Sequence, residues 1–162
     1  MLACAAIAAL LPLPAQARLQ CVPYARAVSG IELHGNAKLW WGKAENRYRR
    51  GQEPRAGAVL AFRPTAAMPY GHVATVKRII DERRLLLDHA NWSGPGLIER
   101  AALAVDVSDA GDWSAVRVWY GPSGALGSRE NPTFGFIYPD RADESPAPPP
   151  PLVSGRIIAA AP

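Results

Sequence analysis

Two residues whose side chains could together perform nucleophilic catalysis stand in distinctive local sequences. Cys21 lies within Leu19–Tyr24 (LQCVPY), directly before a segment with helical spacing, and His72 lies within Tyr70–Ala74 (YGHVA), where a strand is predicted to begin. A thiol becomes a useful nucleophile when a helix N-terminus and a nearby imidazole stabilise its thiolate. One cysteine with histidines elsewhere in the chain is typical of a thiol hydrolase. The pattern therefore favours acyl transfer through Cys21, with His72 as the base, over a buried inert thiol.

The next predicted strand ends in two candidates for the group that orients the base, His89 and Asn91. The period of two along a strand puts His89 and Asn91 on one face and Asp88 on the other. In a hairpin that face meets the face carrying His72, so His89 or Asn91 could fix the tautomer of the base. Asn91 equally suits a turn, because asparagine is a common turn former. The third position stays open between these two residues, with Asp88 ranked behind them.

Two further residues are candidates for binding the substrate. Gln20 could add a side-chain donor to the backbone N–H groups at the helix start, where an oxyanion would form, although a solvent-facing polar residue explains it equally well. Trp92 either lines a groove or belongs to the core. A zinc site built from Cys21 and the histidines is the alternative use of the reactive side chains. No short ligand spacing supports it, so we expect neither a metal nor a cofactor.

The elements that must position these residues are helices followed by antiparallel strands. Helical spacing predicts a helix over Val22–Ser29, stopped by Gly30, and a second from Ala37 to Tyr48. Apolar and alternating segments predict five strands and a further edge strand: Ala58–Phe62, Gly71–Ile80, Arg84–Asn91, Ile98–Val107, Ala115–Tyr120 and Phe134–Tyr138. This order predicts an α+β domain with N-terminal helices packed on an antiparallel β-sheet.

Length and composition predict one exported domain. The chain has 162 residues, which suits a single domain. The apolar run Leu2–Leu13 followed by Ala15-Gln16-Ala17 predicts a signal peptide over residues 1–17, whose removal leaves Cys21 as the single cysteine. Residues 18–138 would form the catalytic domain, and the Pro-rich residues 139–162 a disordered tail. We expect a periplasmic or extracellular monomer with no integral membrane segment after signal cleavage.

The charge of the chain suits an anionic surface. Its net charge is +4, and Arg47–Arg50 is the one dense basic run. A basic exported protein is drawn to polyanionic envelopes. No recognition-helix motif or zinc-finger spacing is present, so we expect no nucleic-acid partner.

Five ordered motifs resemble those of one family, the CHAP domains, which are cysteine- and histidine-dependent amidohydrolases and peptidases with a papain-like core. The resemblance covers roughly residues 19 to 120, and its motifs are Gln20–Tyr24, Gly35–Ala37 with Trp40, Gly57–Val59, Gly71–Ala74 and Asn91-Trp92. The resemblance implies a papain-like fold, with Cys21 as nucleophile and His72 as base. Family members often carry a Glu two residues before the Asn that precedes Trp, and His89 stands there in this chain. Related papain-like cell-wall peptidases use a second histidine at that place.

The resemblance also implies a substrate, the amide bonds of peptidoglycan or of soluble muropeptides. The prediction is therefore an exported peptidoglycan amidohydrolase or endopeptidase. Two alternatives are an inactive cell-wall-binding module, which the departure at His89 would favour, and a secreted thiol amidase acting on an amide outside the wall.

Overall fold

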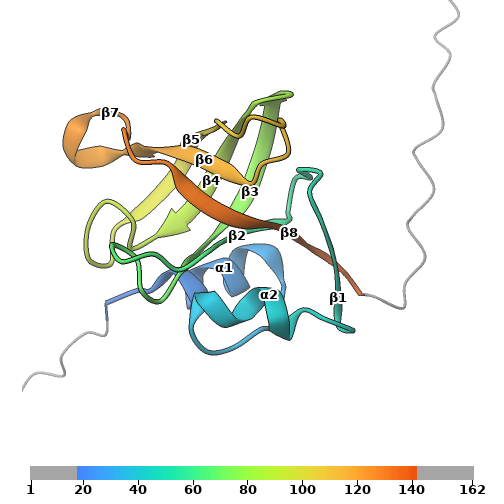
Figure 1. Ribbon diagram of the computed structural model, residues 1–162. Coiled ribbons are helices and arrows are strands. Elements are labelled where there is room, and N and C mark those ends of the chain that lie inside the picture. The colour runs from blue at the N-terminus through green and yellow to red at the C-terminus, as the bar shows by residue number, and fades with distance from the viewer. Residues whose placement is uncertain (1–17, 142–162) are drawn as a thin grey trace, which may run out of the picture.

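β-Strands make up most of the regular secondary structure in this computed structural model, which describes residues 18–141 (Figure 1). The predicted signal peptide and residues 142–162 of the predicted tail lie outside the described residues. Two α-helices and two 3-10 helices accompany eight strands in this part of the chain. In chain order the elements are α1 (Cys21–Ser29), η1 (Ala37–Leu39), α2 (Trp40–Lys43), β1 (Tyr48–Gly51), β2 (Val59–Phe62), β3 (His72–Asp81), β4 (Arg84–Ala90), β5 (Ile98–Asp106), β6 (Ala115–Tyr120), η2 (Gly121–Ser123), β7 (Ala125–Leu126) and β8 (Asn131–Arg141).

The sheet closes on itself, so the predicted α+β, papain-like fold is wrong. The strand order is β1-β8-β2-β3-β4-β5-β6-β7, and β8 pairs with β6 as well as with β2. Strands β2 to β6 and β8 thus form a closed antiparallel barrel, with β1 and β7 as additions. The α-helices are short, nine residues for α1 and four for α2. The domain is a β-barrel with small helices on its outside, rather than an open sheet covered by helices.

Strand β8 is the reason for the difference. The sequence predicts only an edge strand over Phe134–Tyr138, but β8 lies between β1 and β2 and reaches β6 through Ala115↔Pro132. Gly135 makes this inner position feasible. Its φ is +123°, and a Cβ there would lie 2.5 Å from the carbonyl oxygen of Gly51. Pairings between segments so far apart along the chain leave no periodic signal in the sequence.

Two hydrophobic clusters explain why strand β2 is buried on both faces. Leu60 and Phe62 point into the barrel, where they join a cluster that includes Phe136. Val59 and Ala61 point outward and pack with the helical segment, where Trp40 is fully buried. The barrel and its outer helices are therefore tied together by alternate residues of the same strand.

The helical segment differs in part from its prediction. The helix predicted over Val22–Ser29 is confirmed as α1, which begins one residue earlier at Cys21 and ends at Gly30 in the left-handed conformation. The helix predicted from Ala37 to Tyr48 is shorter, because η1 and α2 end by Lys43 and Asn46 has a positive φ of 59°. No helix within residues 18–141 has the length and apolarity needed to cross a membrane.

Candidate active site

Cys21 is the first residue of α1, one residue before the predicted start of this helix. Gln20 precedes it in an extended conformation, with φ −98° and ψ 161°. Pro23 falls in the first turn of the helix, where its missing N–H leaves no bond unmade. The thiol is free and half-buried. Its helix packs against β3 and β4, the two strands that carry the histidines.

His72 is the first residue of β3, and Gly71 places it there. Gly71 has a φ of +68°, and a Cβ at this position would lie 2.8 Å from the backbone nitrogen of Lys38. The Lys38 N–H also donates a 2.8 Å hydrogen bond to the carbonyl of Tyr70. Only glycine tolerates both the left-handed backbone and this close approach. The turn before β3 is thus fixed against η1, and His72 emerges pairing with Phe62 of β2.

The structure brings His89 into direct contact with His72. His89 lies near the end of β4 and is fully buried, while His72 is 4% exposed. The Nε2 atom of His72 and the Nδ1 atom of His89 lie 3.1 Å apart, within hydrogen-bond distance. Because Nε2 of His72 is engaged with His89, Nδ1 is the ring nitrogen of His72 that remains available to another group.

Asn91 lies away from His72 and contacts Gln20 instead. Its backbone is left-handed, with a φ of 63°, directly after β4. The side-chain N–H of Asn91 donates to Oε1 of Gln20 at 3.0 Å, and its Oδ1 accepts from the backbone N–H of Gly96. Asn91 thus ties the loop after β4 to the residue that precedes Cys21. Asp88 also points elsewhere, since its carboxylate accepts from the backbone N–H of Ala101 at 2.8 Å.

Trp92 packs against both histidines. Its ring centroid lies 4.9 Å from that of His72 and 5.6 Å from that of His89. Its indole N–H donates to the carbonyl of Trp119 at 3.1 Å, which fixes the ring. The residue therefore has both roles that the sequence left open, because it packs on the core and also lines the cavity that contains Cys21.

Burial determines the protonation of the site. Burial raises the pKa of the Cys21 thiol, against the opposing effect of the backbone N–H groups of Val73, Val22 and Cys21. Burial also lowers the pKa of His72 well below 6.5, and the neighbouring His89 lowers it further. These effects favour a neutral thiol beside a neutral imidazole. The helix N-terminus therefore does not by itself hold Cys21 as a thiolate.

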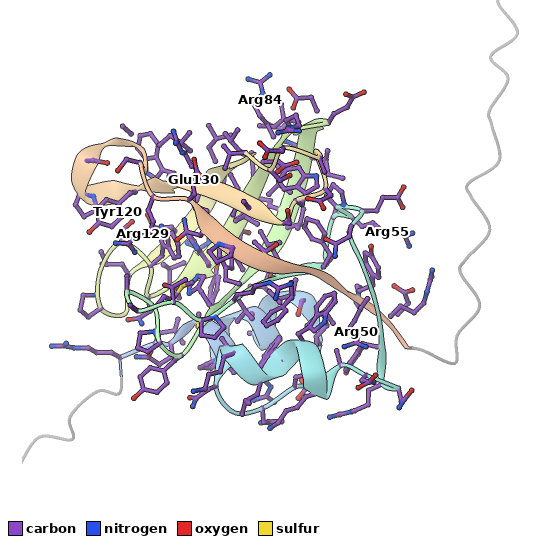
Figure 2. The ribbon with its side chains drawn as sticks, viewed as in Figure 1. Arg50, Arg55, Arg84, Tyr120, Arg129 and Glu130 are labelled. Atoms are coloured by element: carbon purple, nitrogen blue, oxygen red, sulfur yellow. The ribbon has the colours of Figure 1, made fainter. Side chains whose placement is uncertain are left out.

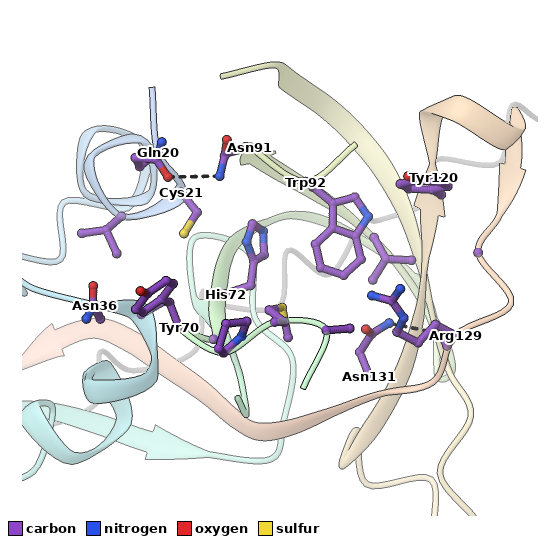
Figure 3. Close-up of a pocket in the computed structure, with 18 of the residues that line it drawn as sticks. Gln20, Cys21, Asn36, Tyr70, His72, Asn91, Trp92, Tyr120, Arg129 and Asn131 are labelled. Atoms are coloured by element: carbon purple, nitrogen blue, oxygen red, sulfur yellow. Dashed lines mark hydrogen bonds between the residues drawn. The ribbon is translucent and has the colours of Figure 1, made fainter. Parts of the chain in front are cut away.

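A cavity of about 740 Å³ contains the proposed nucleophile and base (Figure 3). Cys21 and His72 lie between Asn36 and Tyr70 on one side and Trp92 on the other. Beyond Trp92 the cavity continues to a wall formed by three residues that the sequence did not single out: Tyr120, Arg129 and Asn131. Figure 2 shows Tyr120 and Arg129 at the same end of the molecule, far from Arg50 and Arg55.

Sequence reasoning also missed one partly buried neighbour of the histidines, Glu99 at the start of β5. Residue 99 is the cross-strand partner of His89, and Oε2 of its carboxylate lies 3.4 Å from Nε2 of His89. The sequence predicts the two strands, over 84–91 and 98–107, that carry His89 and Glu99. Only the register of their pairing shows that these two residues are neighbours. Within residues 18–141, no three His, Cys, Asp or Glu side chains converge as metal ligands would.

Comparison with known families identifies the part of the chain that holds these residues. Residues 14–91 match the family model of the CHAP domain, which confirms the resemblance seen in the sequence. The matched segment contains Cys21, His72, His89 and Asn91 and ends before Glu99. The search for similar curated proteins found no match.

Proposed function

We propose that the chain is an exported cysteine amidohydrolase or endopeptidase that cleaves amide bonds in peptidoglycan, because residues 14–91 match the family model of the CHAP domain. A CHAP domain in general suggests an amidase or peptidase that acts on peptidoglycan. The observation that carries the proposal for this chain is the arrangement of its own residues. Cys21 at a helix N-terminus shares one cavity with His72, whose far nitrogen is 3.1 Å from His89.

The proposed reaction is acyl transfer through a thioester. The Cys21 sulfur attacks the amide carbonyl carbon while Nδ1 of His72 accepts the thiol proton. Backbone N–H groups at the start of α1, with the side chain of Gln20, stabilise the oxyanion. His72 then gives the proton to the amide nitrogen as the carbon–nitrogen bond breaks and the amine leaves. Water hydrolyses the thioester, which releases the acid and restores the thiol.

The charge of the cavity supports an anionic substrate. Arg129 is the one side chain among the cavity-lining residues with a permanent charge. The described residues contain no carboxylate within ion-pair distance of it, in contrast to Arg117, which pairs with Glu130 at 2.9 Å. Peptidoglycan stem peptides carry free carboxylates, which a guanidinium binds in a bidentate manner. A stem peptide lying past Trp92 would bring a carboxylate to Arg129.

The proposed place of action is the periplasm or the cell exterior. The support is the sequence of residues 2–17, an apolar run followed by a small-x-small motif. Fusion of residues 1–17 to a reporter enzyme that is active only outside the cytoplasm tests this point. Reporter activity is the expected result, and a cytoplasmic, inactive reporter would contradict export.

Digestion of purified peptidoglycan tests the enzymatic proposal. The protein without residues 1–17 is incubated with sacculi, and soluble fragments are analysed by mass spectrometry for new amine and carboxylate termini. We expect one type of amide bond to be cleaved by the wild type and no cleavage by Cys21→Ser, since a hydroxyl is far less acidic than a thiol. Equal cleavage by both proteins would exclude the thiol mechanism. Binding to sacculi without cleavage by the wild type would instead indicate a wall-binding module.

A further inference from the structure

The carboxylate of Glu99 lies behind the pair His72 and His89, and it has no role in the proposed acyl-transfer reaction. Its side chain is 15% exposed, and Nε2 of the fully buried His89 lies 3.4 Å from it. This Nε2 atom forms no hydrogen bond in the described part of the chain. A separation of 3.4 Å is within ion-pair range and slightly longer than a well-formed hydrogen bond. Among residues 18–141, Glu99 is the one carboxylate within ion-pair distance of this buried nitrogen.

The carboxylate of Glu99 is itself held in place. Its Oε1 accepts a 2.6 Å hydrogen bond from the hydroxyl of Ser93, and its Oε2 accepts from the Ser93 N–H at 3.2 Å. The Ser93 hydroxyl in turn accepts from the backbone N–H of Gly121 at 2.8 Å. No Lys or Arg among residues 18–141 lies within ion-pair distance of Glu99. The negative charge therefore faces the histidines without a competing cation.

These contacts determine which ring nitrogens carry protons. A neutral imidazole has one N–H and one lone pair, and the partner of one nitrogen decides the state of the other. With Nε2–H of His89 toward Glu99, Nδ1 of His89 is an acceptor. It can then accept only from Nε2–H of His72, which leaves the Nδ1 lone pair of His72 for the thiol of Cys21. The opposite polarity would set a lone pair of His89 against the carboxylate, in a buried site where such repulsion is strong.

We propose that Glu99 is a positioning residue. It fixes the tautomer of His89, and His89 in turn fixes the tautomer of His72, so that Nδ1 of His72 is the base for Cys21. When His72 takes the thiol proton, the positive charge of the imidazolium is stabilised through His89 by the Glu99 carboxylate. No proton passes to Glu99. The inference rests on the proposed function for its catalytic consequence, but the tautomer assignment stands independently of any substrate.

Nitrogen NMR of the histidine rings tests the tautomers without an activity assay. The chain has three histidines, so a long-range ¹H–¹⁵N spectrum of histidine-labelled protein can be assigned with single His→Gln variants. We expect Nε2–H tautomers for both His72 and His89 above pH 7, and mixed tautomers for the exposed His34. An Nδ1–H tautomer at His89 would overturn the proposal, whether or not the protein cleaves peptidoglycan.

Two variants on the same strand separate positioning from support of the fold. Glu99→Gln keeps the shape of the side chain and removes its charge, whereas Asp106→Asn alters a buried carboxylate at the other end of β5 that binds Ser108. We expect Glu99→Gln to slow alkylation of Cys21 by iodoacetamide at pH 7, followed by mass spectrometry of the Cys21 peptide. We also expect it to lower kcat by roughly 10- to 100-fold with KM unchanged, by analogy with the loss of a group that orients a metal-bound histidine.

Asp106→Asn should leave the alkylation rate, the kcat and the histidine spectrum as in the wild type, even where it lowers the melting temperature. Alkylation at the wild-type rate in folded Glu99→Gln would overturn the proposal. If Glu99→Gln is alkylated slowly but the wild type does not cleave peptidoglycan, the positioning role of Glu99 is supported and the peptidoglycan substrate is refuted. Equal losses in both variants would show that Glu99 acts only by supporting the fold.

Discussion

Removal of His89 should disable the proposed base while leaving the protein folded. His89→Ala takes away the hydrogen-bond partner at 3.1 Å from Nε2 of His72, which is 4% exposed. A buried donor left unpaired costs about 1–3 kcal/mol. If the contact between His89 and His72 stabilises the transition state by that much more than it stabilises the free enzyme, its loss corresponds to a roughly 5- to 150-fold fall in kcat/KM. His89→Gln should recover part of the loss, because its carbonyl oxygen can accept the His72 proton.

Asp88→Ala is the matched control for this prediction. Asp88 is adjacent in β4, and its side chain is 14% exposed and accepts from the backbone N–H of Ala101. It makes no hydrogen bond to His72, so turnover of a soluble muropeptide should stay close to that of the wild type. Both variants are first compared by thermal unfolding to show that they fold. Greater loss of turnover in Asp88→Ala than in His89→Ala would refute the assignment of His89 as the partner of the base.

Three more perturbations probe the same site. His72→Ala should slow alkylation of Cys21 at pH 7, since burial raises the pKa of the thiol and no other described base shares its cavity; an unchanged rate would show that His72 does not remove the thiol proton. Gly71→Ala should lower the free energy of unfolding by about 1–3 kcal/mol, because its φ is +68° and the new Cβ would meet Lys38 at 2.8 Å. Gly42→Ala, with no atom within 4 Å of its added Cβ, should have little effect, and equal Tm values for the two variants would contradict the role of Gly71. The free energy of unfolding should fall as pH drops from 6.5 to 4. Burial lowers the pKa of His89 from 6.5 to about 4, against the opposing effects of Glu99 and Asp88. The unfolded chain therefore binds a proton at a higher pH than the folded protein does, which favours unfolding. Urea titrations across this range should show a loss of up to about 3 kcal/mol, which His89→Gln should reduce.

Local sequence predicts the parts of this site that depend on neighbours along the chain. The helix at Cys21, the stop at Gly30 and the hairpin of β3 and β4 all follow from spacing and turn residues, and the structure contains each of them. The barrel does not follow, because its closure depends on β8 pairing with β1, β2 and β6. Those partners are separated along the chain by up to about ninety residues, and their pairing leaves no local pattern to read.

The same distinction explains why the sequence predicts His89 as a site residue but not Glu99. The period of two placed His89 on the face of His72 from β4 alone, whereas Glu99 becomes its neighbour only through the register His89↔Glu99 between β4 and β5. That register contains an irregularity between Leu87 and His89, so counting along an ideal ladder would give a different partner. The irregularity thus determines which residue of β5 faces the histidine.

The pair of His89 and Glu99 also accounts for the departure from the common family pattern. A Glu at position 89 would place a carboxylate directly against the base, and a histidine alone at this position carries no negative charge to stabilise an imidazolium. In this chain the carboxylate lies on the next strand, 3.4 Å behind the imidazole of His89. The buried His89 can then transmit the effect of the charge, since its Nδ1 contacts His72 while its Nε2 faces Glu99. Under the proposed role of Glu99, the replacement of the family's Glu by His89 inserts one imidazole ring between the base and the carboxylate that orients it.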